Sequence, residues 1–217
     1  VDPTKAPLRQ FKSRPDLGDS PLPRVRFEGA ALDSVCARRP LVVEIGCGVG
    51  LHPIQYAQQE TTKSIIAIER TREKFQKFEG RLKAHPHLQD RICAVHADAV
   101  HFLDQNMRNG SLDEVWILYP NPEIAKTSRR WFQTPFMGRL VELIRTEGRL
   151  YFATNIENYA REVESLAPSF GFKIMNDQQI HISTSPEFSP RTHFEKKYFE
   201  RGETLFNFEF QLGRSEV

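Results

Sequence analysis

The stretch LVVEIGCGVG, residues Leu41–Gly50, decides the fold. Its first half is a short apolar run, which predicts a buried strand, and its second half is a glycine-rich turn. A helical segment follows at about residue 52. Glycine lets the backbone approach a ligand because it carries no Cβ. A strand, a glycine turn and a helix in this order predict a ligand site at the carboxyl end of a parallel strand.

Outward from this stretch, apolar runs alternate with helix-forming segments. The predicted strands are 41–45, 64–68, 92–96, 112–119 and 148–154, and the predicted helices are 52–60, 71–84, 99–107, 131–145 and 157–167. Such alternation is typical of βαβ crossovers. Two further strand-like runs, 172–175 and 204–210, are separated by a long polar segment without an obvious helix. We therefore predict a Rossmann-like α/β fold with a mostly parallel seven-stranded sheet, an antiparallel edge strand, and helices on both faces.

The composition predicts one globular unit. The chain has 217 residues, of which 39% are hydrophobic, and sixteen phenylalanines would have nowhere to pack in a disordered chain. The net charge of +2 excludes a binder that depends on charge alone, but not a nucleic-acid enzyme with a local basic patch. No stretch approaches the roughly 20 apolar residues of a membrane span.

The N-terminal segment differs from the rest. Residues 1–39 are predicted to form a basic arm and residues 40–217 the folded domain, because prolines and basic residues crowd positions 1–26. The arm could contact RNA, but it could also be a plain leader or an extension packed on the core. Its polar composition predicts no secretory signal.

The cysteines and histidines predict neither a disulfide nor a metal site. Cys36, Cys47 and Cys93 form no C-x-x-C pair, which indicates reduced thiols in a cytoplasmic protein. Cys47 lies within the glycine loop, where we expect it to pack and not to act as a nucleophile. The seven histidines show no ligand spacing, so we expect no metal.

Acidic residues at the strand ends point to a nucleoside ligand. Glu69 ends the second strand, where its carboxylate could accept both hydroxyls of a ribose, and Asp98 follows the third, where an adenine amino group could donate to it. Glu44 lies near the expected position of an amino-acid ammonium group. The loop lacks the patterns G-x-G-x-x-G and G-K-[ST] of phosphate-binding loops. Although any single acid could be a solvated strand end, the combination predicts S-adenosylmethionine.

Residues Val43–Gly50 resemble motif I of the class I S-adenosylmethionine-dependent methyltransferases. Between about Pro40 and Phe210 the chain resembles the bacterial tRNA (guanine-N7)-methyltransferases more narrowly. The family's I-G-I-E is similar to Ile66–Glu69, and its D-A is similar to Asp98–Ala99. The resemblance implies the cofactor-binding residues Glu44, Gly46, Gly48, Gly50, Glu69, Asp98, Ala99 and Asn121.

Three later segments carry the narrower resemblance. The family's F-P-D-P-W is similar to Tyr119–Glu123 (YPNPE), its T-D-x-x-x-Y-A to Thr154–Ala160 (TNIENYA), and its T-[KR]-[FY]-E to Thr192–Glu195 (THFE). The resemblance implies that Asn121 is catalytic. It also implies the substrate-binding residues Lys126, Arg129, Arg130, Asn155, Thr192, His193, Phe194 and Glu195, with tRNA as the partner.

A basic and aromatic cluster follows the fourth strand. Lys126, Arg129 and Arg130 could hold RNA phosphates while Trp131 and Phe132 stack on an extruded base. Alternatively, the two aromatic residues belong to a helix core and the arginines are solvated.

The chain departs from the family pattern at three motif positions, and the basic residue after the motif appears one place late, at Lys126. Asn121 stands where the family has its catalytic aspartate, Glu123 where it has tryptophan, and Asn155 where it has a substrate-binding aspartate. An amide keeps a carbonyl acceptor but loses the charge, and charge-assisted hydrogen bonds are roughly twice as strong as neutral ones. The loss at each position is on the order of 1–3 kcal/mol.

These departures leave three functions open. The chain methylates guanine N7 in tRNA, with other residues compensating; it methylates another acceptor, such as another RNA base or a small-molecule amine; or it is a non-catalytic RNA-binding homologue. Asn121-Pro122 is similar to the start of the N-P-P-[YF] motif of amino methyltransferases, although Glu123 replaces the second proline. The oligomeric expectation is a monomer or a homodimer.

Overall fold

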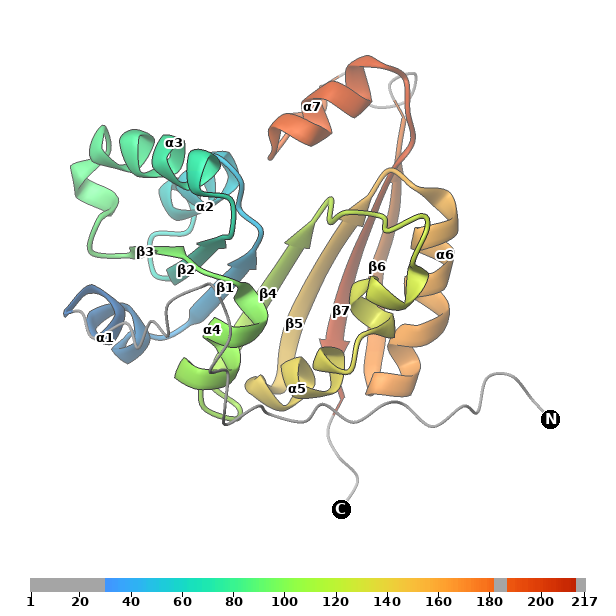
Figure 1. The fold of residues 1–217 in the computed structure, drawn as a ribbon, viewed down its shortest axis with the longest axis horizontal. Coiled ribbons are helices and arrows are strands. Elements are labelled where there is room, and N and C mark those ends of the chain that lie inside the picture. Colours follow the sequence, from blue (N-terminus) through green and yellow to red (C-terminus); the bar gives the residue numbers. More distant parts are fainter. Residues whose placement is uncertain (1–29, 182–186, 214–217) are drawn as a thin grey trace.

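A computed structural model describes residues 30–181 and 187–213 of the chain (Figure 1). Its strands form one sheet in the order β3-β2-β1-β4-β5-β7-β6. The strands are β1 (Leu41–Ile45), β2 (Ser64–Glu69), β3 (Ile92–His96), β4 (Leu112–Leu118), β5 (Ile144–Thr154), β6 (Phe172–Ile180) and β7 (Leu205–Leu212). The helices are α1 (Ala30–Ala37), α2 (Leu51–Gln59), α3 (Arg72–Lys83), α4 (Ala99–Asn106), α5 (Phe136–Leu143), α6 (Glu157–Leu166) and α7 (His193–Glu200).

Strands β1 to β5 pair in parallel, whereas β7 runs antiparallel to both β5 and β6. The order reverses beside β1, which lies between β2 and β4. In open α/β sheets a ligand crevice forms at such a reversal, beyond the carboxyl ends of the strands. The predicted Rossmann-like fold, with its seven-stranded sheet and antiparallel edge, is confirmed.

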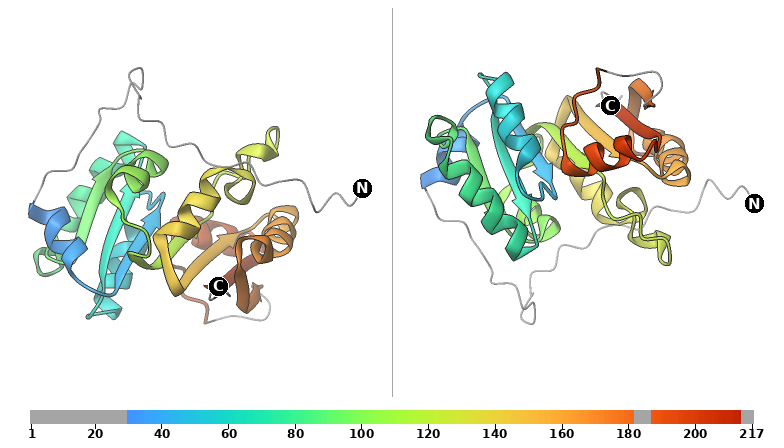
Figure 2. Two further views of the ribbon diagram at one scale, coloured as in Figure 1. Left: turned by 90° about the horizontal axis from the view of Figure 1, so that it is seen from below. Right: turned by 90° about the horizontal axis from the view of Figure 1, so that it is seen from above.

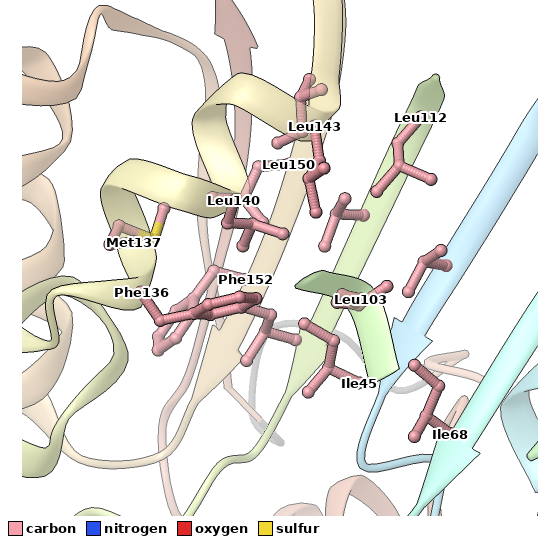
Figure 3. Close-up of a cluster of buried hydrophobic side chains, with 14 of the residues drawn as sticks. Ile45, Ile68, Leu103, Leu112, Phe136, Met137, Leu140, Leu143, Leu150 and Phe152 are labelled. Atoms are coloured by element: carbon pink, nitrogen blue, oxygen red, sulfur yellow. The ribbon is translucent and has the colours of Figure 1, made fainter. Parts of the chain in front are cut away.

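Helices cover both faces of the sheet. The larger buried cluster packs apolar side chains of α1, α4, α5 and α6 against one face, and Figure 3 shows Phe136, Leu140 and Leu103 of this cluster meeting the strands. A smaller cluster packs α2 and α3 against the other face. Because side chains of a strand alternate between faces, Val43 joins the first cluster and its neighbour Val42 the second.

Two helices were not predicted from the sequence. Helix α1 lies within the segment 1–39 that was expected to be an arm, and its Leu32 and Val35 are buried in the core. The arm residues 1–29 lie outside the described part of the chain. Helix α7 occupies the polar segment for which we expected no helix, so that expectation is wrong.

Other boundaries shift for local reasons. The helix expected at 131–145 is divided: a single 3-10 turn covers Trp131–Gln133, and α5 begins only after Pro135, because proline breaks a helix that would continue through it. Strand β6 extends to Ile180 through exposed polar residues. This exposure is typical of an edge strand. Because the second half of β6 is polar, the apolar pattern did not predict it.

Helix α7 lies beyond the carboxyl ends of the parallel strands (Figure 1), and the view from above in Figure 2 shows it between the α3 side of the molecule and β6. It therefore lies over the edge at which a ligand crevice is expected. None of the described helices is long and apolar enough to cross a membrane.

The tight contact between Gly50 and Phe78 gives a stability prediction. Gly50 has φ +79°, and a Cβ there would overlap the Phe78 ring, whereas Gly110 has φ +64° and open space around the same position. Gly110→Ala should lower the free energy of unfolding by about 1–2 kcal/mol, the cost of a left-handed alanine. Gly50→Ala should cost about 1–3 kcal/mol more through overpacking.

Urea denaturation of the two variants measures this difference. Equal losses in the two variants would mean that the Phe78 ring yields at no cost, which contradicts the prediction.

Candidate functional site at the carboxyl edge of the sheet

The glycine loop presents bare backbone at the end of β1. Gly46 and Gly48 have φ values of +78° and +60°, and a Cβ on either would meet no atom within 4 Å. The backbone N–H of Gly46 donates to the Ile68 carbonyl at 2.8 Å, which ties the loop to β2. Gly50 differs, since its missing Cβ makes room for Phe78. Two of the three predicted glycines therefore face open space, and the third is required for packing.

Glu69 ends β2 with a buried carboxylate that touches this loop. Its Oε2 accepts from the Gly48 N–H at 2.9 Å, and its Oε1 accepts from the Thr71 N–H at 2.6 Å. A carboxylate has about four acceptor sites, so about two remain for ligand hydroxyls. The arrangement fits the predicted ribose contact and orients the carboxylate in advance.

Asp98 and Ala99 follow β3 beside Glu69. The Ala97 N–H donates to the Glu69 carbonyl at 3.3 Å, so the ends of β2 and β3 are held together. Asp98 also caps α4, because its Oδ1 accepts from the backbone N–H groups of Val100 and His101 at 3.0 and 3.3 Å. Both of these bonds end on Oδ1, so Oδ2 is the oxygen that could accept from the predicted adenine amino group.

Glu44 has a partner that the sequence did not predict. Its buried carboxylate oxygen Oε2 lies 2.9 Å from Nδ1 of His52, which is also buried, on α2. The His52 ring packs against Trp116 with 4.7 Å between centroids. One oxygen of Glu44 is thus occupied, and Oε1 is the atom that could meet an ammonium group.

Cys47 packs inside the protein. Burial raises the pKa of its thiol well above the ordinary value, and the charges of Glu44 and Glu69 raise it further. The thiol is therefore protonated at neutral pH, as a packing residue requires. Among residues 30–181 and 187–213, no group of three or more potential ligands could hold a metal ion.

Tyr119 and Asn121 form the turn after β4. The Tyr119 N–H donates to the Ala153 carbonyl of β5 at 2.8 Å, and Tyr119 has a positive φ of 50°. The exposed Asn121 folds back on its own turn, since its Oδ1 accepts from the Glu123 N–H at 3.2 Å. The predicted catalytic amide therefore lies at the same sheet edge as the glycine loop, on the β4 side.

The basic segment that follows divides into two parts. The buried Arg130 donates to Glu162 and to the Pro122 carbonyl, each at 2.7 Å, and lies over the Tyr159 ring. Its guanidinium therefore holds the segment against α6. Phe132 is buried, as the core alternative predicted, and Trp131 is half-buried.

Lys126 and Arg129 are exposed on this segment. They are the two members of the predicted basic cluster whose charges face solvent, and they lie beyond the end of β4.

A buried carboxylate holds α7 in place. Glu195 is fully buried and accepts from the Arg191 backbone N–H at 2.6 Å and from the Arg191 Nε at 2.9 Å. The Tyr119 hydroxyl donates to it at 3.1 Å, and Arg191 also binds Asn207 of β7. Burial raises the pKa of Tyr119, and the Glu195 charge raises it further, so this hydroxyl remains a donor. The structure thus gives Glu195 internal partners, although the resemblance implies a substrate contact.

Two aromatic residues of α7 lie one turn apart and contact neighbouring elements. Phe194 is 42% exposed and lies nearly parallel to Tyr198, with 6.1 Å between ring centroids, and the Tyr119 ring is 5.7 Å from that of Tyr198. The Lys74 ammonium of α3 lies 5.8 Å from the Phe194 ring. The neighbouring His193 is exposed. Helix α7 therefore reaches across the site from the β4 side to α3.

The start of α7 explains the position of Thr192. Its Oγ1 accepts from the Glu195 N–H at 3.0 Å, which makes Thr192 the N-cap of the helix. Asn155, at the end of β5, donates from its Nδ2 to Glu203 at 2.6 Å. His52, Arg191, Tyr198 and Glu203 were not predicted as site residues. Tyr198 and Glu203 meet partners that are distant in the sequence, whereas His52 and Arg191 lie near Glu44 and Glu195 in the sequence, but no sequence pattern indicated these pairings.

The chain is similar to several characterised proteins. It is 27% identical over 184 residues to a tRNA (guanine-N(7)-)-methyltransferase of Neisseria meningitidis, covering 81% of this chain and 73% of that protein. It is 29% identical over 183 residues to a protein of the same name from Nitrosomonas eutropha, covering 80% and 77%.

Solved structures share the fold. An antibiotic-related methyltransferase has a TM-score of 0.63 at 15% identity, over 83% of this chain and 92% of that one. The 16S rRNA methyltransferase KamB also has a TM-score of 0.63, at 13% identity, over 84% and 92%. The precorrin-6y C5,15-methyltransferase of Geobacter metallireducens has a TM-score of 0.56 at 13% identity, over 83% and 85%. These likenesses establish the class I methyltransferase fold.

A family model described as "Putative methyltransferase" matches residues 38–208. The match spans the strands from β1 through β6, the glycine loop and the first half of β7. Since it covers well over half of the chain, this protein belongs to that methyltransferase family.

Proposed function

We propose that this protein transfers a methyl group from S-adenosylmethionine to N7 of a guanine in tRNA. The contact that carries the cofactor assignment joins the Glu69 carboxylate to the Gly48 N–H, beside a loop with open space at Gly46. It supplies an oriented acceptor for ribose hydroxyls next to bare backbone. Asp98 on the neighbouring strand end adds an acceptor for adenine.

The choice of acceptor is supported by the relatives. The matching proteins from Neisseria and Nitrosomonas bear the name tRNA (guanine-N(7)-)-methyltransferase. The exposed charges of Lys126 and Arg129 suit RNA phosphates, and the exposed Phe194 offers a ring on which a base can stack.

The proposed reaction needs no general base, because guanine N7 already carries a free lone pair. Bound S-adenosylmethionine supplies a methyl group on a sulfonium; the N7 lone pair forms the new bond, and the sulfur keeps the electrons of the broken one. Positive charge moves to the guanine ring, so the protein must align the ring and accept its N–H groups. Asn121, at the end of β4, offers a carbonyl acceptor at the methyl-transfer point.

A second candidate is methylation of a different acceptor. It is favoured by Asn121, because an amide carbonyl can accept from an attacking amine whereas the family pattern has a carboxylate there. The same fold and cofactor would serve both reactions.

Cofactor binding provides the first test. Calorimetric titration with S-adenosylhomocysteine should detect binding to the wild type. Glu69→Ala should weaken it about 10- to 100-fold, because a charged acceptor of ribose hydroxyls is lost. Glu73→Ala, in the first turn of α3 and exposed, is the matched control and should bind normally. No heat with the wild type, or equal affinity in both variants, would contradict the assignment.

The acceptor is tested by Asn121→Asp. Unmodified tRNA is incubated with labelled cofactor and the modified nucleotide is mapped. The aspartate can keep the bond to the Glu123 N–H, because the accepting oxygen is retained. It should raise N7 methylation about tenfold by restoring a charge near the positive ring. Asn176→Asp on the exposed edge strand should change nothing. A fall in activity, or label on another atom, would favour the second candidate.

The basic segment predicts a salt dependence. In the double variant Lys126→Ala/Arg129→Ala, tRNA affinity should fall, and the slope of log affinity against log salt should decrease by about 2. Arg108→Ala, exposed in the loop before β4, lies at the opposite edge of the sheet and should leave the slope unchanged. An unaltered slope in the double variant would place the phosphate contacts elsewhere.

A further inference from the structure

The amide of Asn155 has a carboxylate partner from a distant part of the sequence. Asn155 follows β5 at the carboxyl edge, and its Nδ2 donates to Oε2 of Glu203 at 2.6 Å, although 48 residues separate the two. The Glu203 N–H donates to the Tyr198 carbonyl at 3.0 Å, so the last turn of α7 fixes its backbone. A carboxylate thus lies one hydrogen bond away from position 155.

We infer that Glu203 is the carboxylate that binds the methyl-acceptor base, and that Asn155 is a positioning residue for it. This inference rests on the proposed function. The resemblance implies an aspartate at position 155, and here the charge is supplied instead by Glu203, in the segment between α7 and the neighbouring strand β7. The extra methylene of glutamate provides the reach that the shift requires.

The location suits this role. The Tyr119 N–H donates to the Ala153 carbonyl, so the end of β5 adjoins the turn that contains Asn121. Thr154 pairs with Phe206, which brings the residues preceding β7 to the same edge. Glu203 and Asn121 therefore flank the ends of β4 and β5, where an acceptor base would lie.

The carboxylate of Glu203 can also accept further hydrogen bonds. Its side chain is 34% exposed, and its Oε1 forms an ion pair with the Arg201 Nη1 at 3.8 Å, which is too long for a hydrogen bond. Guanine presents N1–H and its 2-amino group side by side, and a carboxylate can accept from both. A negative charge here also opposes the positive charge that develops on the ring during transfer. Asn155 holds Oε2, so the group is oriented before the base arrives.

A charge swap tests the inference. Glu203→Gln should lower kcat/KM for tRNA about 10- to 100-fold, because the charged acceptor is lost. The affinity for S-adenosylhomocysteine should stay unchanged, and the melting temperature should shift by less than about 2 °C. The double variant Asn155→Asp/Glu203→Gln restores the charge and reverses the hydrogen bond, so it should recover most of the activity. Glu200→Gln, exposed on α7, is the matched control.

The outcomes separate this inference from the proposed function. If the wild type methylates tRNA and Glu203→Gln keeps its kcat/KM, the inference is overturned. It is also overturned if activity, cofactor affinity and melting temperature all fall and the swap recovers none of them, because the pair is then structural.

If the wild type transfers no methyl group to tRNA, the proposed function fails, and tRNA affinity decides the role of Glu203. Removing an ordinary surface carboxylate strengthens binding to a polyanion, as Glu200→Gln should show. Weaker binding by Glu203→Gln, restored by the swap, supports a specific base contact, whereas unchanged or stronger binding overturns it.

Discussion

A buried carboxylate must have its charge compensated by partners inside the protein. The part of the site near α7 and the end of β4, where we propose that the methyl acceptor binds, depends on how the charge of Glu195 is compensated. An unpaired buried charge costs several kcal/mol, so any movement that separates Glu195 from its partners is strongly unfavourable. They are Arg191 on its own segment and Tyr119 at the end of β4, and Arg191 extends the contact to Asn207 of β7. Helix α7 is thereby fixed over the sheet, and with it the Phe194 ring and the backbone of Glu203.

The cofactor side is built on a different principle. Glu69 accepts from two backbone N–H groups, Gly48 of the glycine loop and Thr71 after β2, and these leave acceptor capacity on both oxygens. Such a carboxylate is oriented without being neutralised by a counter-charge. The contrast with Glu195 is chemical: one acid is saturated and positions a helix, whereas the other is partly satisfied and can receive a ligand. The Lys74–Phe194 contact links α3, which follows Glu69, to α7.

Much of the fold could be predicted because its strands are buried on both faces and therefore form continuous apolar runs, as in β1 and β2. The acids at the ends of these runs were predicted for the same reason. Helix α7 has few apolar residues and lies above the sheet, so periodicity could not reveal it. One local signal was present: Thr192 followed by Glu195 is the pattern of a capping box. The Asn155–Glu203 pair has no local signal, since it depends on β5 and β7 becoming neighbours.

The two asparagines that depart from the family pattern are not equivalent. The side-chain oxygen of Asn121 accepts from the Glu123 N–H within the same turn, and neither group carries a charge. Asn155 instead donates a hydrogen bond to Glu203, so a carboxylate charge lies about one hydrogen bond away from position 155. Relative to the family pattern, the chain therefore has no carboxylate at position 121 and has one beside position 155, on Glu203. Under the proposed function, the displaced carboxylate would still orient an acceptor base, and the neutral amide at position 121 would set how strongly the positive charge on that base is stabilised.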